Sequence, residues 1–514
     1  MSSRMTAKRA SARRLQFLYS RQAFCAPTYT PFRGISSNAA NGSDSAADAI
    51  SRRPTTAPKP IIDVRHIREN PDLYARNCTE RNYPRQATYP PRIVALFSRW
   101  KDLQSSSRAL REESNAVEKA LKQARAMSKG GAEGEGSDGG ALLERARAIK
   151  KELQAVEETE GALTDEMNSL AVSLPNITSD ETPRGDEPKV LCYINDPPPP
   201  PKHDGPGKSH VDIGTELGIL DFASAGGTSG WGFYYLLNEG AQLEQALTQY
   251  ALAVAAKHGW GRVSPPTMVY DFVAEACGFQ PRDQNGEQQI YGITRGADDA
   301  AKGRPGLCLT GTSEIPLAGM KASSSIPVSS LPLKRVASSR CYRAEAGARG
   351  VDTKGLYRVH EFTKVELFAW TEPDAVSTTE IFDEVLDIQT EILHSLGLYC
   401  RVLEMPSTDL GASATRKCDM ETYFPSRSAR NGGWGEVTSA SVCTDYQTRR
   451  LCTRLKDERG KVAGFPWTIN GTALAVPRVI AAILETGWDE ESKSVVIPEC
   501  LRPWMDGRER IGGK

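Results

Sequence analysis

Two series of apolar residues, each repeating every seven positions, dominate the hydrophobic pattern of the first third of the chain. The first series has one row beginning at Ile93 and another beginning at Leu96, and the residues between them are mostly charged or serine. A glycine-rich stretch at 130–140 interrupts the pattern, and a similar series then begins at Leu142, broken once at Glu160. Apolar a and d positions sustained over about four heptads predict a coiled coil. Two such helices joined by a short loop predict a long antiparallel helical hairpin.

The remaining hydrophobic pattern divides the chain into segments. A short helix is expected over 63–74, with Asp63 as its N-cap. Further on, helical stretches at 241–258 and 374–396 stand between β-rich runs without a regular βαβ rhythm. This arrangement predicts an α+β fold, with an antiparallel sheet flanked by helices and preceded by the coiled-coil arm. The expected parts are an N-terminal leader and disordered linker at 1–45, an N-terminal domain at 61–176 whose hairpin spans about 90–174, a Pro-rich linker at 177–210, and a globular domain at 211–514.

Composition narrows the classes of function. Lys plus Arg and Asp plus Glu number 64 each, so no global field attracts nucleic acid, and any RNA contact must be local. The 11 cysteines include no C-x-x-C pair, which favours reduced thiols in an intracellular compartment and argues against a cysteine-based zinc site. The longest apolar run, at 473–484, is interrupted by Pro477 and Arg478, so no transmembrane helix is predicted.

The first 45 residues differ in composition from the rest. Seven basic residues precede Asp44, the first acidic residue, and serines are frequent. An Arg-rich, Ser-rich and acid-poor start is typical of an organelle transit peptide. A disordered basic tail that binds RNA, or nothing, is the alternative. Removing the segment would leave a mildly acidic protein, which makes a diffuse RNA-binding surface less favourable.

A different pattern, alternating with period two, runs along the segment that ends at Glu366. Strand geometry places Arg358, His360, Phe362, Lys364 and Glu366 on one face and leaves Val359, Val365 and Leu367 on the other. Arg343 and Glu345 share one parity on the preceding run, and the glycines between the two runs predict a hairpin. Cations, carboxylates and an aromatic face on one wall are what a nucleoside triphosphate site requires.

Three further polar clusters lie in the same domain. Thr312-Ser313-Glu314 offers hydroxyls and a carboxylate to an ammonium group, although a surface turn is the alternative. Glu436 and Ser439, in the run Glu436-Val437-Thr438-Ser439, offer oxygen ligands to a magnesium ion, with a solvated strand end as the alternative. Arg478 follows Asn470–Pro477 in the first turn of an apolar helix, where a cation gains nothing from the helix dipole. A bound anion in front of Arg478 would explain its position.

Basic residues also gather toward the tip of the predicted hairpin. They lead into the tip on the first helix and away from it on the second, so they meet on the distal half of an antiparallel pair. A local basic patch is the electrostatic mark of an RNA contact, whereas a dimerisation or spacer coiled coil is the alternative. The residues are Lys119, Lys122, Arg125, Lys129, Arg145, Arg147, Lys150 and Lys151.

In these motifs the chain resembles the class II aminoacyl-tRNA synthetases, and among them the seryl-tRNA synthetase family in its mitochondrial form. The resemblance covers nearly all of the chain from Ile62 to about Gly507. The runs 343–347 and 358–366 are similar to motif 2, Pro266 to the motif 1 proline, and 471–478 to motif 3. Ala473 and Pro477 depart from the glycines of many bacterial members and resemble organellar forms. Proline is tolerated in the first turn of a helix, so Arg478 can still be placed.

The resemblance implies a role for each candidate residue. Arg343 and Arg478 would be catalytic, with Arg343 on the α-phosphate and Arg358 and Arg478 on the outer phosphates. Glu345 would accept a hydrogen bond from the adenine amino group, and Phe362 would stack on the ring. The L-serine site would comprise Thr312, Ser313, Glu314, Arg343, Glu366, Asn470 and Thr472; the ATP site Arg343, Ala344, Glu345, Arg358, Phe362, Glu436, Val437, Thr438, Ser439 and Arg478; and the Mg²⁺ site Glu436 and Ser439.

The implied activity is that of a serine–tRNA ligase of the mitochondrial matrix. Serine and ATP would form seryl-adenylate, and the seryl group would pass to the 3′-terminal adenosine of tRNA(Ser) on a homodimer built around motif 1. The Arg349–Gly355 loop would order over the acceptor end. Two alternatives are a degenerate relative that binds organellar RNA without catalysis, and a ligase that charges a carrier protein. Retention of the phosphate and metal residues argues against the first, and the long arm argues against the second.

Overall fold

The computed structural model describes most of the chain, in ranges separated by short gaps. These ranges are 57–129, 138–196, 207–279, 289–296, 298–299, 302–344, 355–428 and 431–513. Several predictions fall outside the described residues: the segment 1–45, Glu345 with the loop at 346–354, and the side chains of Arg125 and Lys129.

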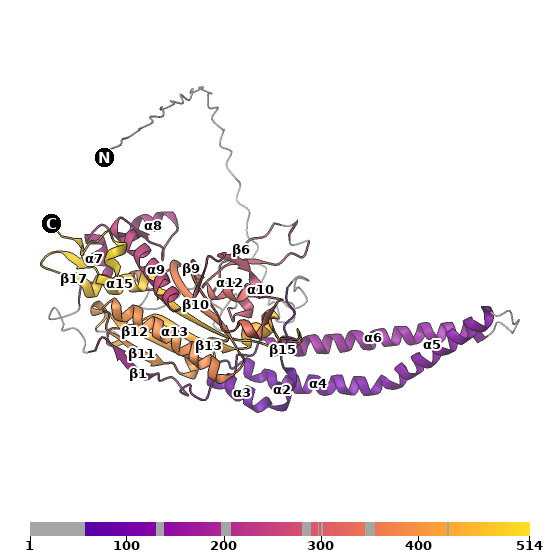
Figure 1. Ribbon diagram of the computed structural model, residues 1–514. Helices are drawn as coiled ribbons and strands as arrows, with labels where there is room; N and C mark the ends of the chain where they lie inside the picture. The colour runs from indigo at the N-terminus through magenta and orange to yellow at the C-terminus, as the bar shows by residue number, and fades with distance from the viewer. Residues whose placement is uncertain are drawn as a thin grey trace, which may run out of the picture. The chain divides into compact units, whose positions relative to one another are not determined.

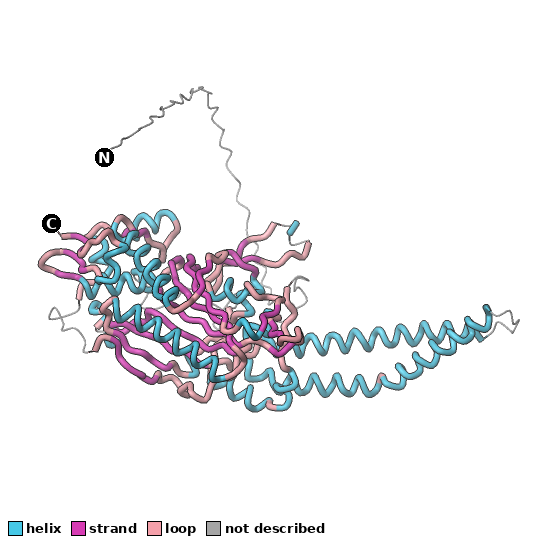
Figure 2. The backbone as a smooth tube through the Cα atoms, in the orientation of Figure 1, coloured by secondary structure: helices cyan, strands magenta, loops and turns pink. Residues whose placement is uncertain are grey.

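The N-terminal domain contains the predicted helical hairpin (Figure 1). Helices α4 and α5 run outward and α6 returns beside them (Figure 2). The heptad positions of both sides are buried or half-buried, with Ile93 and Ile149 almost fully enclosed, and most residues between them are exposed. At 1.5 Å per residue, the 35 residues of α6 extend for about 50 Å. The helices are α2 (Val64–Glu69), α3 (Pro71–Glu80), α4 (Tyr89–Ser106), α5 (Arg108–Lys129) and α6 (Asp138–Val172).

The helix expected over 63–74 is shorter than predicted. Asp63 is its N-cap as expected, because its side chain accepts a hydrogen bond from the His66 amide at 2.9 Å. The helix ends at Glu69, and α3 begins two residues later at Pro71. A residue that precedes proline is disfavoured in helical geometry, and Asn70 accordingly has φ −132° and ψ 50°.

The outgoing helix of the hairpin also breaks once, at Ser107. Three serines stand together here, and the hydroxyls of Ser106 and Ser107 donate to the carbonyl oxygens of Leu103 and Gln104. Serine side chains that bond to nearby carbonyls compete with regular helix geometry and often bend it. The heptad register continues through the break. Ser107 lies in the same heptad row as Ile93 and is buried between the two sides of the hairpin.

A mixed but mainly antiparallel sheet forms the centre of the C-terminal domain, in the spatial order β1-β11-β12-β13-β16-β10-β9-β4. Each neighbouring pair is antiparallel except β4 with β9. The predicted α+β fold is therefore confirmed. The strands are β1 (Lys189–Ile194), β4 (Gly261–Val263), β9 (Leu333–Tyr342), β10 (Glu361–Thr371), β11 (Cys400–Glu404), β12 (Arg416–Tyr423), β13 (Trp434–Thr444) and β16 (Trp467–Ala475).

Helices cover one face of this sheet and enclose the main core (Figure 1). The two helices predicted at 241–258 and 374–396 are both present, and Asp374 caps the second by accepting from the Ser377 amide at 2.9 Å. The helices around this core are α7 (His210–Glu216), α8 (Phe222–Thr228), α9 (Glu239–Lys257), α13 (Ala375–Ser395) and α15 (Val476–Gly487).

A second, smaller core covers part of the opposite face. Its helices are α10 (Asp271–Ala276), α12 (Glu314–Gly319) and α14 (Tyr446–Leu451), beside the short strands β5 (Met268–Tyr270), β6 (Gly292–Ile293), β7 (Leu307–Leu309), β8 (Ser325–Pro327), β14 (Arg454–Lys456) and β15 (Val462–Gly464). The remaining short strands are β2 (Leu220–Asp221), β3 (Tyr235–Leu236), β17 (Trp488–Asp489), β18 (Ser494–Val496) and β19 (Arg510–Gly512).

The two cores divide the side chains of β10 between them. Val365 and Leu367 point into the main core, whereas Phe368 and Trp370 belong to the smaller one. The smaller core covers only the second half of the strand. Residues 362–366 on that face are therefore left to line a pocket.

The segment 177–210, expected to be a linker, contributes to the sheet. Its residues Lys189–Ile194 form β1, which pairs antiparallel with β11 at the sheet edge. Residues 190–194 are all apolar, so the sequence carries a short apolar run consistent with a strand but no alternation, and five of the six side chains of β1 are exposed. The proline run that follows β1 in the sequence is typical of a linker, and it led to the prediction of a linker over the whole segment.

Candidate active site

The pocket in the open half of the sheet gathers residues from segments far apart in the sequence. It lies over β10, β13 and β16, with α12 and the 3₁₀ turn Gly355–Tyr357 at its sides. Nearly all of the predicted site residues that the structure describes line it. They are Thr312, Glu314, Arg343, Arg358, Phe362, Glu366, Glu436, Val437, Thr438, Ser439, Asn470, Thr472 and Arg478.

The alternation predicted for β10 holds from Phe362 onward and fails before it. Phe362, Lys364 and Glu366 line the pocket, as the period-two pattern requires. The strand begins only at Glu361, so the pattern does not reach His360, which stacks against Phe233 and bonds to the carbonyl oxygen of Arg343. Arg358 reaches the pocket from the turn before the strand, and so does Val359.

Two β-bulges bring residues of opposite parity onto the pocket wall. Glu436 and Ser439 differ in parity, but the register with β12 shifts between Glu436 and Thr438. The register shift adds one unpaired residue to β13, and the side chains of Glu436 and Ser439 therefore both line the pocket. A second register shift, between β10 and β16, places Thr472 opposite Glu366 and leaves Ala473 as the extra residue.

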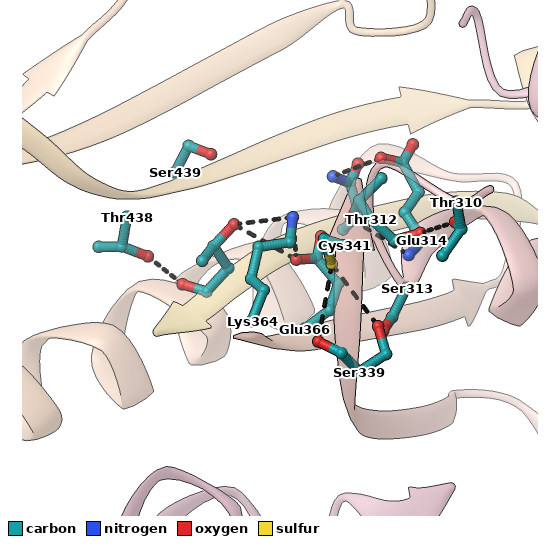
Figure 3. A network of polar contacts seen from close by, with 12 residues as sticks. Thr310, Thr312, Ser313, Glu314, Ser339, Cys341, Lys364, Glu366, Thr438 and Ser439 are labelled. Carbon is teal, nitrogen blue, oxygen red and sulfur yellow. Dashed lines mark hydrogen bonds and ion pairs between the residues drawn. The ribbon is translucent and has the colours of Figure 1, made fainter. Parts of the chain in front are cut away.

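One half of the pocket is a buried polar cluster around Glu366. The Lys364 Nζ lies 2.6 Å from its Oε2 (Figure 3). The Thr472 hydroxyl donates to the same oxygen at 3.3 Å. Glu366 is 1% exposed, yet its other oxygen, Oε1, has no hydrogen-bond partner among the described residues. A buried acceptor without a partner is costly. A hydroxyl donor in the pocket would satisfy it.

Glu314 stands across this half, on the first turn of α12. Its Oε1 accepts from Gln447 Nε2 at 2.6 Å, and its Oε2 from Asn470 Nδ2 at 3.3 Å. Burial, and then the charge of Glu366, raises the pKa of Glu314 to about 8. A cation placed between the two carboxylates would relieve both effects. This half therefore suits a small molecule that carries an ammonium group and a hydroxyl.

The other half of the pocket holds cations. Arg478 donates to the backbone carbonyls of Tyr357 and Glu436, and its Nη1 lies 3.1 Å from the Glu436 carboxylate. Burial would raise the pKa of Glu436, but the cations of Arg478, Lys417 and Arg343 hold it below its ordinary value. Arg343 and Arg358 form no ion pair with the described residues, and Arg343 lies over the Phe362 ring at 5.4 Å. Cations beside an aromatic face suit a phosphorylated nucleotide.

Two parts of the chain match models of known families. Residues 61–178 match the seryl-tRNA synthetase N-terminal domain, and residues 301–487 match the tRNA synthetase class II core domain (G, H, P, S and T). The mitochondrial serine–tRNA ligase of Saccharomyces cerevisiae is 41% identical, over 71% of this chain and 78% of its own. That of Schizosaccharomyces pombe is 37% identical, over 87% and 88%. The chain belongs to the seryl-tRNA synthetase family.

Solved structures and bacterial relatives agree with this assignment. The seryl-tRNA synthetase from Pyrococcus horikoshii complexed with ATP matches with a TM-score of 0.75 and 31% identity, over 88% of this chain and 100% of that one. The serine–tRNA ligase of Treponema denticola is 36% identical over 88% of this chain and all of its own. The predicted family, its class II fold and the enzyme class are confirmed. The protein is a serine–tRNA ligase, a class II aminoacyl-tRNA synthetase.

Two predicted residues of this seryl-tRNA synthetase do not line the pocket. Ser313 is fully buried beneath it, where its hydroxyl lies 2.6 Å from that of Ser339. Ala344 bonds through its amide to the carbonyl of Gln289 instead. The alternative that Thr312-Ser313-Glu314 forms a surface turn is wrong, because all three residues are buried.

The sequence did not assign three residues that help to build the synthetase site. Lys364 pairs with Glu366, and Tyr357 lies under the Arg478 guanidinium at 4.7 Å. Gln447, from α14, orients Glu314 while its own Oε1 accepts from Thr468 at 2.7 Å. Lys364 lies on the predicted face, so the alternation could have found it. Nothing in the sequence separates Gln447 from a surface glutamine.

The motif 3 substitutions are accommodated in this seryl-tRNA synthetase. Pro477 lies in the first turn of α15, where a missing amide proton costs no helical hydrogen bond, and Arg478 follows it into the pocket. Ala473 is the bulged residue of β16, and its side chain is buried in the main core. Neither change replaces a charged residue, and Arg478 lines the pocket.

The basic residues of the arm are exposed wherever the structure describes them. Arg145 is partly neutralised by Glu113 at 2.7 Å, and Lys122 lies 3.7 Å from Glu118. Lys119, Arg147, Lys150 and Lys151 are exposed, and none forms an ion pair within the described ranges. Glu160, the break in the second heptad row, meets Arg111 across the hairpin at 2.6 Å.

Among the helices that the structure describes, none combines the length and the apolar character that a membrane span requires.

Proposed function

We propose that this serine–tRNA ligase acts in the mitochondrial matrix, using ATP and Mg²⁺ to activate L-serine in the pocket described above. The observation that carries the activation of serine with ATP is the division of one pocket into an anionic half around Glu314 and Glu366 and a cationic half around Arg343, Arg358 and Arg478. The two halves match the two substrates of adenylate formation. The solved relatives complexed with ATP and AMP support a nucleotide in the cationic half.

In the anionic half, Glu314 receives the ammonium group of serine. Glu366 and Thr472 bind its hydroxyl, and the unpartnered Glu366 Oε1 accepts the hydroxyl proton in a hydrogen bond. Alanine would leave that buried oxygen without a donor. A site built to bond a hydroxyl discriminates strongly against the analogue that lacks it.

In the cationic half, Phe362 stacks on the adenine and the arginines hold the phosphates. The charge of Arg343 acts on Glu314 in one half and on Glu436 in the other, so Arg343 would lie where the serine carboxylate meets the α-phosphate. A preorganised cation at this point stabilises the charge that develops in the transition state. Pyrophosphate leaves toward Arg358 and Arg478.

The residues present fit a magnesium ion that is held mainly through the nucleotide. Glu436 and Ser439 face the pocket together because of the bulge, and Glu436 is kept anionic by its cationic neighbours. No group of three or more His, Cys, Asp or Glu within the described ranges could hold a metal by itself. Two oxygen ligands supplemented by phosphates are the usual arrangement for Mg²⁺. When bound, the ion would neutralise phosphate charge during in-line attack.

Three further features support the transfer of the seryl group to tRNA(Ser), the homodimer and the location in the matrix. The exposed basic residues of α5 and α6 bind the backbone of tRNA(Ser), and a homodimer forms around motif 1, where Met268 and Tyr270 are about half exposed. The mitochondrial relatives and the basic composition of residues 1–45 support the matrix.

Aminoacylation of purified tRNA tests this proposal. The chain without residues 1–45 should charge total mitochondrial tRNA with serine much faster than cytosolic tRNA. Imported full-length chain should also be shortened inside isolated mitochondria. Equal charging of both tRNA pools, together with no import, would contradict the assignment to the matrix.

A further inference from the structure

A buried amide behind the sheet links the two halves of the pocket. Gln389 lies on α13 and is fully enclosed. Its Nε2 lies 2.8 Å from the carbonyl oxygen of Ser439 and 2.9 Å from that of Thr472, and 3.0 Å from the hydroxyl of Thr438. One side chain thus contacts β13, which carries the proposed magnesium ligands, and β16, which carries the proposed serine ligand.

These contacts lie where the two strands separate. The ladder between β13 and β16 ends with Ala440 opposite Gly471, so Ser439 and Thr472, the next residues, are no longer paired with each other. Both bulges lie just beyond this point, at Glu436–Thr438 and at Ala473. Gln389 therefore supplies hydrogen bonds to carbonyl oxygens at the end of the ladder.

The surroundings keep the amide in this position. Helix α13 approaches the sheet so closely that a Cβ on Gly471 would come within 2.5 Å of Val385 Cγ1 and 3.4 Å of Gln389 Nε2. The Oε1 of Gln389 has no partner among the described residues. The hydrogen bonds of Nε2 therefore determine the orientation of the Gln389 amide. A buried acceptor without a partner costs free energy, and this cost accompanies the placement of Nε2 between the two strands.

We propose that Gln389 is a positioning residue that holds Ser439 and Thr472 in register, so that the Mg²⁺–ATP subsite and the serine subsite share one amide as a support, beside the hydrogen bond from the Thr438 hydroxyl to the Thr472 carbonyl. The inference rests on the proposed roles of Ser439 and Thr472. It goes beyond them in assigning a shared support to subsites on different strands. Loss of the amide would displace the Ser439 hydroxyl and the Thr472 hydroxyl together.

Equilibrium binding tests the inference without relying on turnover. Isothermal titration of the full chain would measure the dissociation constants of serine alone, of ATP with Mg²⁺, and of ATP with EDTA. Gln389→Met keeps the volume and removes the donor. We expect it to weaken serine and Mg²⁺–ATP by about tenfold each, the effect of losing roughly one hydrogen bond, and to leave ATP in EDTA unchanged because the arginines are intact.

Two further variants separate positioning from general destabilisation. Ile388→Val alters the neighbouring buried residue of α13 without touching a polar group, and should change none of the three constants. Gln389→Glu can donate only when its carboxyl is protonated. Its serine affinity relative to the parent should therefore be higher at pH 6 than at pH 9, whereas that of Gln389→Met should not vary.

Several outcomes would overturn the inference. A lower melting temperature for Gln389→Met with all three constants unchanged would make the residue merely structural. A loss confined to serine, or confined to Mg²⁺–ATP, would remove the shared support. Failure of the unmodified chain to bind serine would instead overturn the proposed function, and this inference with it.

Discussion

Glu314 and Glu366 face the same pocket but meet different partners. Glu366 has a buried cation, Lys364, at 2.6 Å, whereas Glu314 has two neutral amides. The pattern along β10 was enough to predict Glu366, because a strand alternates. The amide of Gln447 could not be predicted, because α14 reaches Glu314 only through the folding of distant segments. Burial, too, was not visible in the sequence at Thr312-Ser313-Glu314.

The raised pKa of Glu314 makes serine binding depend on pH. Below its pKa of about 8 the carboxyl is neutral, and above it is anionic and attracts the serine ammonium. The dissociation constant of serine should therefore fall as pH rises from 6 to 8, by up to about tenfold per unit. Titration calorimetry measures this. In Glu314→Gln, binding should be weaker and nearly independent of pH over that range, and a parent enzyme without pH dependence would contradict the account.

Lys364 should matter for stability as well as for the site. Lys364→Met leaves the carboxylate of Glu366 buried without its cation, which should lower the free energy of unfolding by about 3 to 5 kcal/mol. The double variant Lys364→Met, Glu366→Gln removes both charges and should recover most of the loss. Urea denaturation followed by circular dichroism compares the three proteins. Equal losses in the single and double variants would show that the pair is not the cause.

The helices of the arm are the elements that the sequence predicts best, and the bulged strands are those it predicts least well. Heptad spacing repeats over many turns, so a single serine triplet at 105–107 bends the helix without hiding the pattern. The bulges in β13 and β16 depend on pairing between strands. No local pattern shows that Glu436 and Ser439 share a face. The apolar run of β1 is short, does not alternate and stands beside a proline run, so it was assigned to a linker.

The exposed cations of α6 should act in tRNA binding and not in activation. Replacing Arg147, Lys150 and Lys151 by Ala should raise the Michaelis constant for tRNA(Ser) and flatten its salt dependence, by about one unit of log–log slope for each phosphate that the protein no longer neutralises. Serine-dependent ATP–pyrophosphate exchange should be unchanged. Arg108→Ala, an exposed change on the proximal part of α5, is the matched control. Loss of exchange in the triple variant would contradict a role confined to tRNA.

For the whole molecule, the exposed apolar side chains of β5 predict association. Met268 is 49% and Tyr270 47% exposed, next to the motif 1 proline, and burying them in a homodimer is favourable. Light scattering after size exclusion should give about twice the chain mass of 56.0 kDa. The double variant Met268→Glu, Tyr270→Glu should shift the mass toward one chain. Val376→Glu, at a residue 70% exposed on α13, should not, and a monomeric parent would contradict the prediction.

The division of one pocket into a serine half and an ATP half is tested most directly by ATP–pyrophosphate exchange with each amino acid in turn. The account predicts strong exchange with serine, little with alanine or threonine, and a loss of the preference for serine over alanine in Glu366→Ala, because the unpaired oxygen of Glu366 then no longer selects a hydroxyl. Strong exchange with alanine or threonine and none with serine would contradict it.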